Sequence, residues 1–250
     1  MFLNPLILLA LKNFRIERFE IVIFEGLNEY TMNIKGIIFD LDGTLINSVE
    51  DIADSLNYTL KRYGFESHSV ENVMDWIGEG AIELIRKAIP ADKIANLDVP
   101  RFLWEYREQY RQNYAVKSTI YEGIPSLLAS LEKLNFSMNI LSNKPDDLTS
   151  LVAGHFFSNS KFDNILGMRD GIPRKPDPAA VLEIAANIKL KPSELLYIGD
   201  SGTDIQTARN SQIKVVAVSW GFRPRAELVK LSPDFLIDVP GELLQLLSSL

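Results

Sequence analysis

The chain alternates short apolar runs with stretches in which apolar residues recur every three or four positions. Four runs are rich in branched residues and nearly free of polar ones, at residues 34–39, 136–141, 195–198 and 215–218. Such runs are typical of parallel strands that helices cover on both faces. Helices are predicted between and after them, at 124–134, 146–156, 178–188 and 204–210. The pattern therefore predicts an α/β protein with a Rossmann-like parallel sheet, completed by shorter strands at 162–166 and 235–237 and a last helix at 243–247.

A block without any strand signal separates the first predicted strand from the second. It holds three helical stretches, at residues 48–64, 70–89 and 99–117. Ser48 and Asp51 stand in a capping-box-like arrangement at the start of the first stretch. The aromatic residues of the third stretch are interpreted as the core of a small bundle. A purely helical block of this length predicts a cap domain, residues 48–118, inserted into a core domain of residues 32–47 and 119–250. The hinges are expected near Asn47 and at 118–122.

Residues 1–31 carry no recognisable motif. The apolar run at 6–11 is too short to cross a bilayer and lacks the basic flank of a signal peptide. Residues 18–25 partly alternate and could form an extra strand. We interpret 1–31 as an N-terminal extension whose role stays open, either an accessory element or a segment before a start at Met32.

Composition excludes several kinds of site and partner. The formal net charge of -7 provides no basic face for nucleic acid, so a small-molecule partner is expected, with neither nucleic acid nor membrane. The absence of cysteine excludes thiolate ligands and a cysteine nucleophile, and two histidines exclude a histidine metal cluster. Any metal must therefore be held by oxygen, which favours Mg²⁺. A cytoplasmic location is expected, and the oligomeric state is left open.

Two carboxylates one residue apart follow the first predicted strand. They are Asp40 and Asp42, with Gly43 directly after them. Sites in open α/β sheets lie beyond the carboxyl ends of the strands, so these side chains are expected in a cleft. A calcium loop would need glycine and glutamate where this chain has Leu45 and Asp51, although a plain polar turn remains an alternative. The favoured interpretation is a carboxylate nucleophile.

Other polar residues follow later strands or lie in adjoining loops. Taken alone, each has a structural interpretation as a turn, a solvated lysine or a helix cap. They are Ser142 and Asn143 after the strand at 136–141, Lys175 before Pro176-Asp177-Pro178, and Asp200 and Asp204 after the strand at 195–198.

Together with the run Asp-Leu-Asp-Gly-Thr-Leu at 40–45, these groups resemble, in order, the four motifs of the haloacid dehalogenase superfamily of phosphohydrolases. The resemblance covers residues 33–250. It implies a parallel-sheet core with a helical cap, and Mg²⁺-dependent hydrolysis of a phosphomonoester through an aspartyl-phosphate.

The resemblance also implies roles for individual residues. Asp40 would be the nucleophile, Asp42 the acid and base, and Lys175 a countercharge; Asp204 would bind the outer shell of the metal or orient Lys175. The implied catalytic residues are Asp40, Asp42, Ser142 and Lys175. The implied metal-binding residues are Asp40, Asp42 through its backbone carbonyl, Asp200 and Asp204. The implied phosphoryl-binding residues are Gly43, Thr44, Ser142, Asn143 and Lys175.

Substrate choice is expected to lie in the cap, because the core contacts only the phosphoryl group that all candidates share. The run Trp-Ile-Gly-Glu-Gly-Ala at 76–81 resembles the specificity loop of phosphoglycolate phosphatases, and residues 219–225 also resemble that branch. This implies 2-phosphoglycolate as the substrate, bound in part by Gly78, Glu79 and Gly80. A glycine-flanked loop is also a common helix connection. The Glu79 carboxylate would repel an anion unless it points away.

Several alternative functions remain open. A sugar phosphomutase similar to β-phosphoglucomutase keeps all four motifs and differs mainly in the cap. A pyrophosphatase or nucleotidase of the same superfamily is a further alternative. A dehalogenase of this fold would not need Asp42 as acid and base. A non-catalytic phosphate-binding protein should have lost an acid or the lysine, and none is missing.

Overall fold

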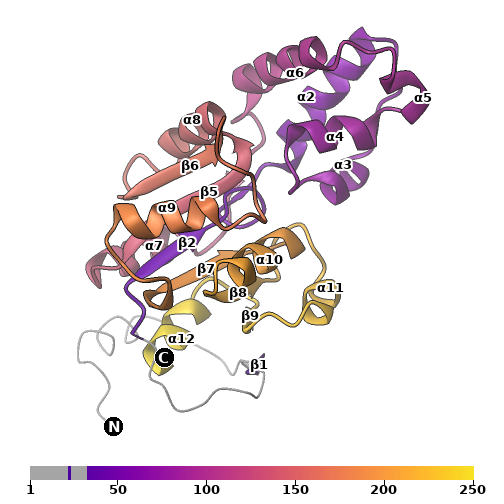
Figure 1. The fold of residues 1–250 in the computed structure, drawn as a ribbon. Helices are drawn as coiled ribbons and strands as arrows, with labels where there is room; N and C mark the ends of the chain where they lie inside the picture. Colours follow the sequence, from indigo (N-terminus) through magenta and orange to yellow (C-terminus); the bar gives the residue numbers. More distant parts are fainter. Residues whose placement is uncertain (1–21, 24–32) are drawn as a thin grey trace.

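The computed structural model describes residues 22–23, by their backbone, and residues 33–250. Within this part of the chain, a seven-stranded sheet has the order β1-β9-β8-β7-β2-β5-β6 (Figure 1). Every neighbouring pair is parallel except β1 with β9. The strands are β1 (Val22–Ile23), β2 (Gly36–Phe39), β5 (Ser137–Pro145), β6 (Asn164–Met168), β7 (Leu195–Gly199), β8 (Lys214–Val218) and β9 (Phe235–Ile237). The predicted parallel α/β sheet is confirmed.

The central strand β2 explains why the sheet forms around residues 36–39. Ile37 and Ile38 are completely buried on opposite faces, because successive side chains of a strand alternate. Phe39 pairs in register with Ile140 of β5 and Ile198 of β7. β2 and β7 therefore end side by side and β5 continues past them to Pro145, so Asp40, Ser142 and Asp200 gather at one edge of the sheet.

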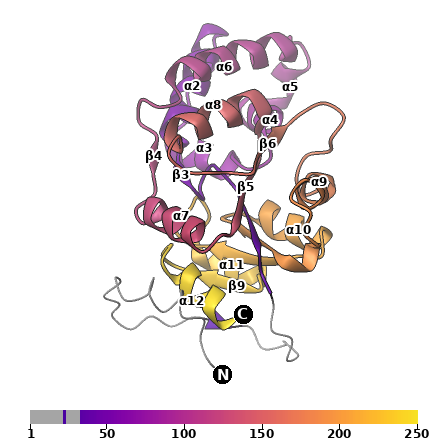
Figure 2. The same ribbon diagram turned by 90° about the vertical axis from the view of Figure 1, so that its left-hand side faces the viewer.

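Helices cover both faces of the sheet, and each face has its own hydrophobic core (Figure 2). One face packs against α7 (Ile124–Lys133), α8 (Asp146–Phe156) and α12 (Glu242–Ser249). The other packs against α9 (Ala179–Asn187), α10 (Gly202–Asn210) and α11 (Arg225–Lys230), and a 3-10 turn, η1 (Pro192–Glu194), precedes β7. Helix α11 was not predicted, and β6 begins two residues later than expected. No helix among the described residues is long and apolar enough to cross a membrane.

The block between the first two core strands is helical, as expected, and lies beyond the carboxyl end of the sheet (Figure 1). Its helices are α2 (Val49–Arg62), α3 (Val70–Trp76), α4 (Ala81–Ala88), α5 (Ala91–Ile94) and α6 (Val99–Asn113). Two short antiparallel strands that the sequence did not predict, β3 (Ile46–Asn47) and β4 (Thr119–Ile120), join it to the sheet. They lie where the hinges were expected, and we propose 48–118 as a cap that moves about this ribbon.

Two local expectations in the helical block were wrong. The expected capping box at the start of α2 is absent, because both side chains have partners outside the helix. Ser48 donates to Asp42, and the Asp51 carboxylate accepts bonds from the Lys117 and Ser118 amides and the Ser118 hydroxyl at 2.7 to 3.0 Å. The helix expected over 70–89 is interrupted after Trp76, since Gly78 and Gly80 have φ values of 119° and 89°.

The possible strand at 18–25 contains β1. Its two residues pair antiparallel with β9, Val22 opposite Leu236, and so extend the edge of the sheet. The other residues of the proposed N-terminal extension lie outside the described part of the chain, and the role of 1–31 stays a prediction.

Candidate active site

Three buried aspartates meet at the carboxyl edge of the sheet. Asp40 follows β2, Asp200 follows β7, and Asp204 lies in the first turn of α10. One carboxylate oxygen from each lies within 4.8 Å of the others. The register of β2 against β7 brings the first two together, because the strands end side by side.

Asp200 is held by loops far apart in the sequence. The Thr44 hydroxyl donates to its Oδ1 at 3.2 Å, and the Phe222 amide donates to its Oδ2 at 2.7 Å. A Cβ on Gly43 would lie 2.3 Å from the Asp200 carboxylate, and one on Gly221 would lie 2.3 Å from the Asp200 Cβ. Both glycines are therefore required by close packing. Thr44 is completely buried, so its hydroxyl orients Asp200, and its predicted contact with substrate stays untested.

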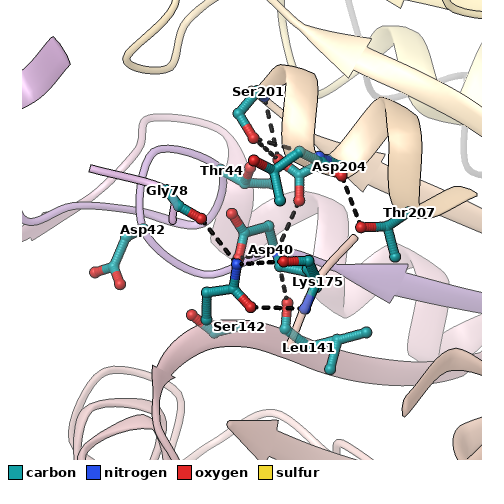
Figure 3. Close-up of polar contacts among 12 residues, drawn as sticks. Asp40, Asp42, Thr44, Gly78, Leu141, Ser142, Lys175, Ser201, Asp204 and Thr207 are labelled. Carbon is teal, nitrogen blue, oxygen red and sulfur yellow. Dashed lines mark hydrogen bonds and ion pairs between the residues drawn. The ribbon is translucent and has the colours of Figure 1, made fainter. Parts of the chain in front are cut away.

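Lys175 is the cation inside the acidic cluster. Its Nζ lies 2.9 Å from Asp40 Oδ1 and 2.7 Å from Asp204 Oδ1, and it donates to the Leu141 carbonyl at 3.2 Å (Figure 3). The second oxygen of Asp204 accepts from the amide and hydroxyl of Ser201, which closes a capping box on α10. With these bonds the geometry favours Asp204 as the residue that orients Lys175.

The cluster has more negative than positive charge. Burial and then the charge of Asp204 raise the pKa of Asp40 well above its usual range, although Lys175 opposes this. Burial and Asp204 also raise the pKa of Asp200 to about 7. Burial alone would lower the pKa of Lys175, but Asp204 and Asp40 raise it well above its usual value. An arrangement of buried, repelling carboxylate oxygens fits a hard divalent cation.

Asp42 is separate from this cluster. Figure 3 shows its carboxylate to one side of the contacts between Asp40 and Lys175. Both oxygens lie 2.6 Å from Lys144 Nζ, and the Ser48 hydroxyl donates to Oδ1 at 2.5 Å. Lys144 was not among the residues predicted for the site, although its side chain is only 7% exposed. The available signal was its position directly after Ser142 and Asn143.

Ser142 and Asn143 also lie at this edge, nearly buried. The Ser142 Oγ accepts a bond from the Lys144 amide at 3.1 Å. The Asn143 side chain accepts from the Lys175 amide at 2.9 Å and donates to the carbonyls of Lys175 and Gly78, at 3.1 and 2.9 Å. Asn143 thus connects the loop that carries Lys175 to the loop between α3 and α4.

Core arginines hold the end of α3 and the loop that follows it by their backbone carbonyls. Arg223 donates to the carbonyls of Met74, Asp75 and Ile77 at 2.7 to 3.0 Å. Arg174 donates to the carbonyl of Glu79. The sequence analysis gave neither arginine a role, although Arg223 belongs to the stretch 219–225 on which the resemblance partly rested.

The side chain of Glu79 points away from the site. Its carboxylate pairs with Lys87 Nζ at 2.8 Å and is 51% exposed. Gly78 and Gly80, by contrast, line a cavity of about 60 Å³ between the sheet edge and the helices. The structure therefore brings the two predicted glycines to the site and removes the expected repulsion by Glu79.

The cavity joins core residues to the helical block. The core contributes Asp40, Asp42, Ser142, Asn143 and Lys144, and the aromatic helix α6 contributes Tyr106, Arg107 and Tyr110. The interpretation of the α6 aromatics as bundle core holds for the buried Phe102. It is incomplete for the two tyrosines, which reach the cavity as well as the core.

Known proteins share this sequence pattern and fold. The family model described as haloacid dehalogenase-like hydrolase matches residues 37–218. A phosphoglycolate phosphatase of Aquifex aeolicus is 32% identical over 213 residues, which cover 85% of this chain and 96% of the relative. One of Chromobacterium violaceum is 30% identical, covering 87% of this chain and 98% of the relative.

Solved structures agree with the fold. A predicted phosphoglycolate phosphatase from Haemophilus somnus superposes with a TM-score of 0.80 at 29% identity, covering 86% of this chain and 98% of that one. A haloacid dehalogenase-like hydrolase from Streptococcus pneumoniae gives 0.77 at 25% identity, covering 86% of this chain and 99% of that one. With these matches, and acids at the carboxyl edge of a parallel sheet, the chain belongs to the haloacid dehalogenase-like hydrolases, in the phosphatase branch similar to phosphoglycolate phosphatases.

Proposed function

We propose that the protein hydrolyses 2-phosphoglycolate to glycolate and phosphate, with Mg²⁺ as its cofactor. The observation that carries the substrate is the cavity of about 60 Å³ beside Asp40. A cavity this small leaves little room beyond the phosphoryl group. This supports a two-carbon tail over the hexose ring of a mutase substrate or the nucleoside of a nucleotide. The names of the relatives support the same substrate.

The carboxylates of Asp40 and Asp200 and the backbone carbonyl of Asp42 would hold the Mg²⁺, with Asp204 beyond them. The buried carboxylate oxygens, whose negative charge exceeds the positive charge beside them, fit this hard cation. Bound there, the cation supplies positive charge that offsets the repulsion between a carboxylate nucleophile and a phosphate monoester.

Asp40 attacks phosphorus, so that a bond from its carboxylate oxygen forms while the bond to the glycolate oxygen breaks. Asp42 in its protonated form gives its proton to that leaving oxygen. In the second half-reaction Asp42 takes a proton from water, the water oxygen attacks phosphorus, and Asp40 is released together with inorganic phosphate.

The surrounding groups hold the phosphoryl oxygens in place. Ser142 and the backbone amides near Gly43 and Asn143 are proposed as hydrogen-bond donors, and Lys175 balances charge on Asp40. Because phosphoryl transfer depends mainly on positioning and charge, the bonds that fix Lys175 and Asp200 matter as much as the groups that react. A small phosphomonoester is the expected partner, and a cytoplasmic location stays a prediction.

The test is a substrate panel with and without Mg²⁺. We expect 2-phosphoglycolate to give a higher kcat/KM than β-glucose 1-phosphate, pyrophosphate or a nucleoside monophosphate, and chelation to abolish turnover. Asp40→Asn should remain folded and lose several orders of magnitude in kcat. Conversion of β-glucose 1-phosphate to glucose 6-phosphate as the main activity would reject the proposal in favour of a mutase. Retained activity in folded Asp40→Asn would reject the nucleophile.

A further inference from the structure

The hydroxyl of Tyr110 is buried without a partner. Tyr110 is 1% exposed and lines the cavity. Its hydroxyl has no hydrogen-bond partner among the described residues. A buried hydroxyl left unpaired costs on the order of 1 to 3 kcal/mol. Because Tyr110 itself lines the cavity, we take a polar group of a ligand bound there as the missing partner of this hydroxyl.

Lys144 lies beside the same tyrosine. Its Nζ is 4.7 Å from the centre of the Tyr110 ring, and it also lines the cavity. Arg107 is a second cation in the wall, although its guanidinium pairs with Asp147 at 2.7 Å. Much of the remaining wall is apolar, including Ile52 and Leu84. A nearly buried ammonium over the ring of a tyrosine whose hydroxyl is unpaired, in the wall of a small and largely apolar cavity, has the chemistry of an anion subsite.

Lys144 forms its ion pair with Asp42, the proposed proton donor. Both oxygens of Asp42 lie 2.6 Å from Lys144 Nζ, so the carboxylate faces the lysine instead of the cluster around Asp40. Asp42 can serve the leaving oxygen only if this pair opens. Opening it without compensation would leave two charges nearly buried and unpaired, which is costly.

We propose that Lys144 and the Tyr110 hydroxyl bind the carboxylate of the substrate, and that this contact exchanges one ion pair for another and releases Asp42. The inference rests on the proposed function. The substrate class is a small phosphomonoester that carries a carboxylate. The carboxylate is attached either to the carbon that bears the ester oxygen or to the next carbon along the chain. Lys144 keeps an anionic partner throughout, because the substrate carboxylate replaces Asp42. Asp42 takes up one proton from solvent as it leaves the lysine, keeps its contact with the Ser48 hydroxyl, and turns toward the leaving oxygen, to which it gives that proton.

The test compares 2-phosphoglycolate with ethyl phosphate, in which a methyl group replaces the carboxylate. In the wild type, 2-phosphoglycolate should have the higher kcat/KM. In Lys144→Met, kcat/KM for 2-phosphoglycolate should fall, and that for ethyl phosphate should rise because Asp42 is no longer tied. The ratio of the two should drop roughly 10- to 100-fold, as expected for a charge-assisted bond.

Further variants separate recognition from folding. Lys144→Arg retains the charge and should restore most of the ratio. Tyr110→Phe removes only the hydroxyl and should lower the ratio roughly 3- to 10-fold. Tyr114→Phe, at the end of the same helix, and Lys61→Met, on an exposed face of α2, are controls outside the cavity and should change neither substrate. Thermal melting curves verify that each variant is folded.

Two outcomes would overturn the inference. Equal losses for both substrates in folded Lys144→Met, with the wild type still preferring 2-phosphoglycolate, would mean that Lys144 does not bind the carboxylate, and the proposed function would stand. A wild type with no preference for 2-phosphoglycolate over ethyl phosphate would overturn both the subsite and the proposed substrate.

Discussion

The side chain of Asn143 and the backbone of Lys175 exchange two hydrogen bonds, at 2.9 and 3.1 Å, across 32 residues of sequence. The same side chain donates to the Gly78 carbonyl at 2.9 Å. One amide therefore fixes the position of the charge-balancing lysine and of the loop that lines the cavity.

Asn143→Ala should misplace Lys175. We expect kcat/KM for an aryl phosphate to fall roughly 10- to 100-fold, and the free energy of unfolding to fall by about 1 to 3 kcal/mol, because buried backbone groups lose their partners. Steady-state kinetics and urea unfolding measure the two effects. Asn96→Ala, at an exposed position of the helical block, is the control. Wild-type kinetics in folded Asn143→Ala would show that Lys175 does not need this support.

Arg223→Met removes three bonds to backbone carbonyls, two in the last turn of α3 and one in the segment between α3 and α4. Because that segment lines the cavity at Gly78 and Gly80, KM for 2-phosphoglycolate should rise about tenfold. The rate on an aryl phosphate, which depends on the core groups, should change much less. Arg225→Met is the matched control, since this exposed arginine pairs with Asp238 away from the cavity. An equal loss on both substrates would indicate damage to Asp200 through Phe222 instead.

Asp42→Asn should affect poor leaving groups more than good ones, because only an alkoxide needs a proton as it leaves. We expect the phosphorylation of Asp40 by 2-phosphoglycolate, whose leaving group is an alkoxide, to slow by about 10² to 10⁴, and that by an aryl phosphate to slow far less. Single-turnover measurement isolates this step from hydrolysis of the intermediate. Asp40→Asn, which should abolish phosphorylation by both esters, gives the background rate of the single-turnover measurement. The same factor for both esters would contradict the acid role.

The raised pKa of Asp200 makes stability without metal depend on pH. Its pKa rises from 3.8 in the unfolded chain to about 7 in the folded protein, chiefly by burial, so folding favours the protonated form. The contribution is complete below about pH 4 and is lost as pH rises through 7, by on the order of a few kcal/mol. Urea unfolding in the presence of a chelator, from pH 5 to 8, measures the loss.

Asp200→Asn should remove this part of the slope, because the amide does not titrate. Carboxylates whose pKa values are lowered, such as Asp147 and Glu79, act in the opposite sense, so the difference between wild type and variant is the informative quantity. Added Mg²⁺ should stabilise the wild type most at the higher pH. Parallel slopes for the two proteins would mean that burial does not shift Asp200.

Local apolar patterns were enough to predict the sheet and the acids at its edge. Apolar runs that end in Asp40, Ser142 and Asp200 identify buried parallel strands, and parallel strands share one carboxyl edge, so local pattern sufficed to bring these residues together. The lysine and Asp204 followed from resemblance of spacing, and their contact at 2.7 Å agrees with the orienting role expected for Asp204.

The partners of the polar side chains depend on contacts between segments that are far apart in the sequence. Ser48 looked like a helix cap and binds Asp42, while Glu79 turns to Lys87. Lys144 pairs with Asp42 across 102 residues, and Arg223 reaches Met74 across 149. Hydrophobic periodicity records which face of an element is buried. It does not predict which distant segment of the chain covers this face. A long polar side chain then bonds to whichever group the packed helices and loops bring within reach.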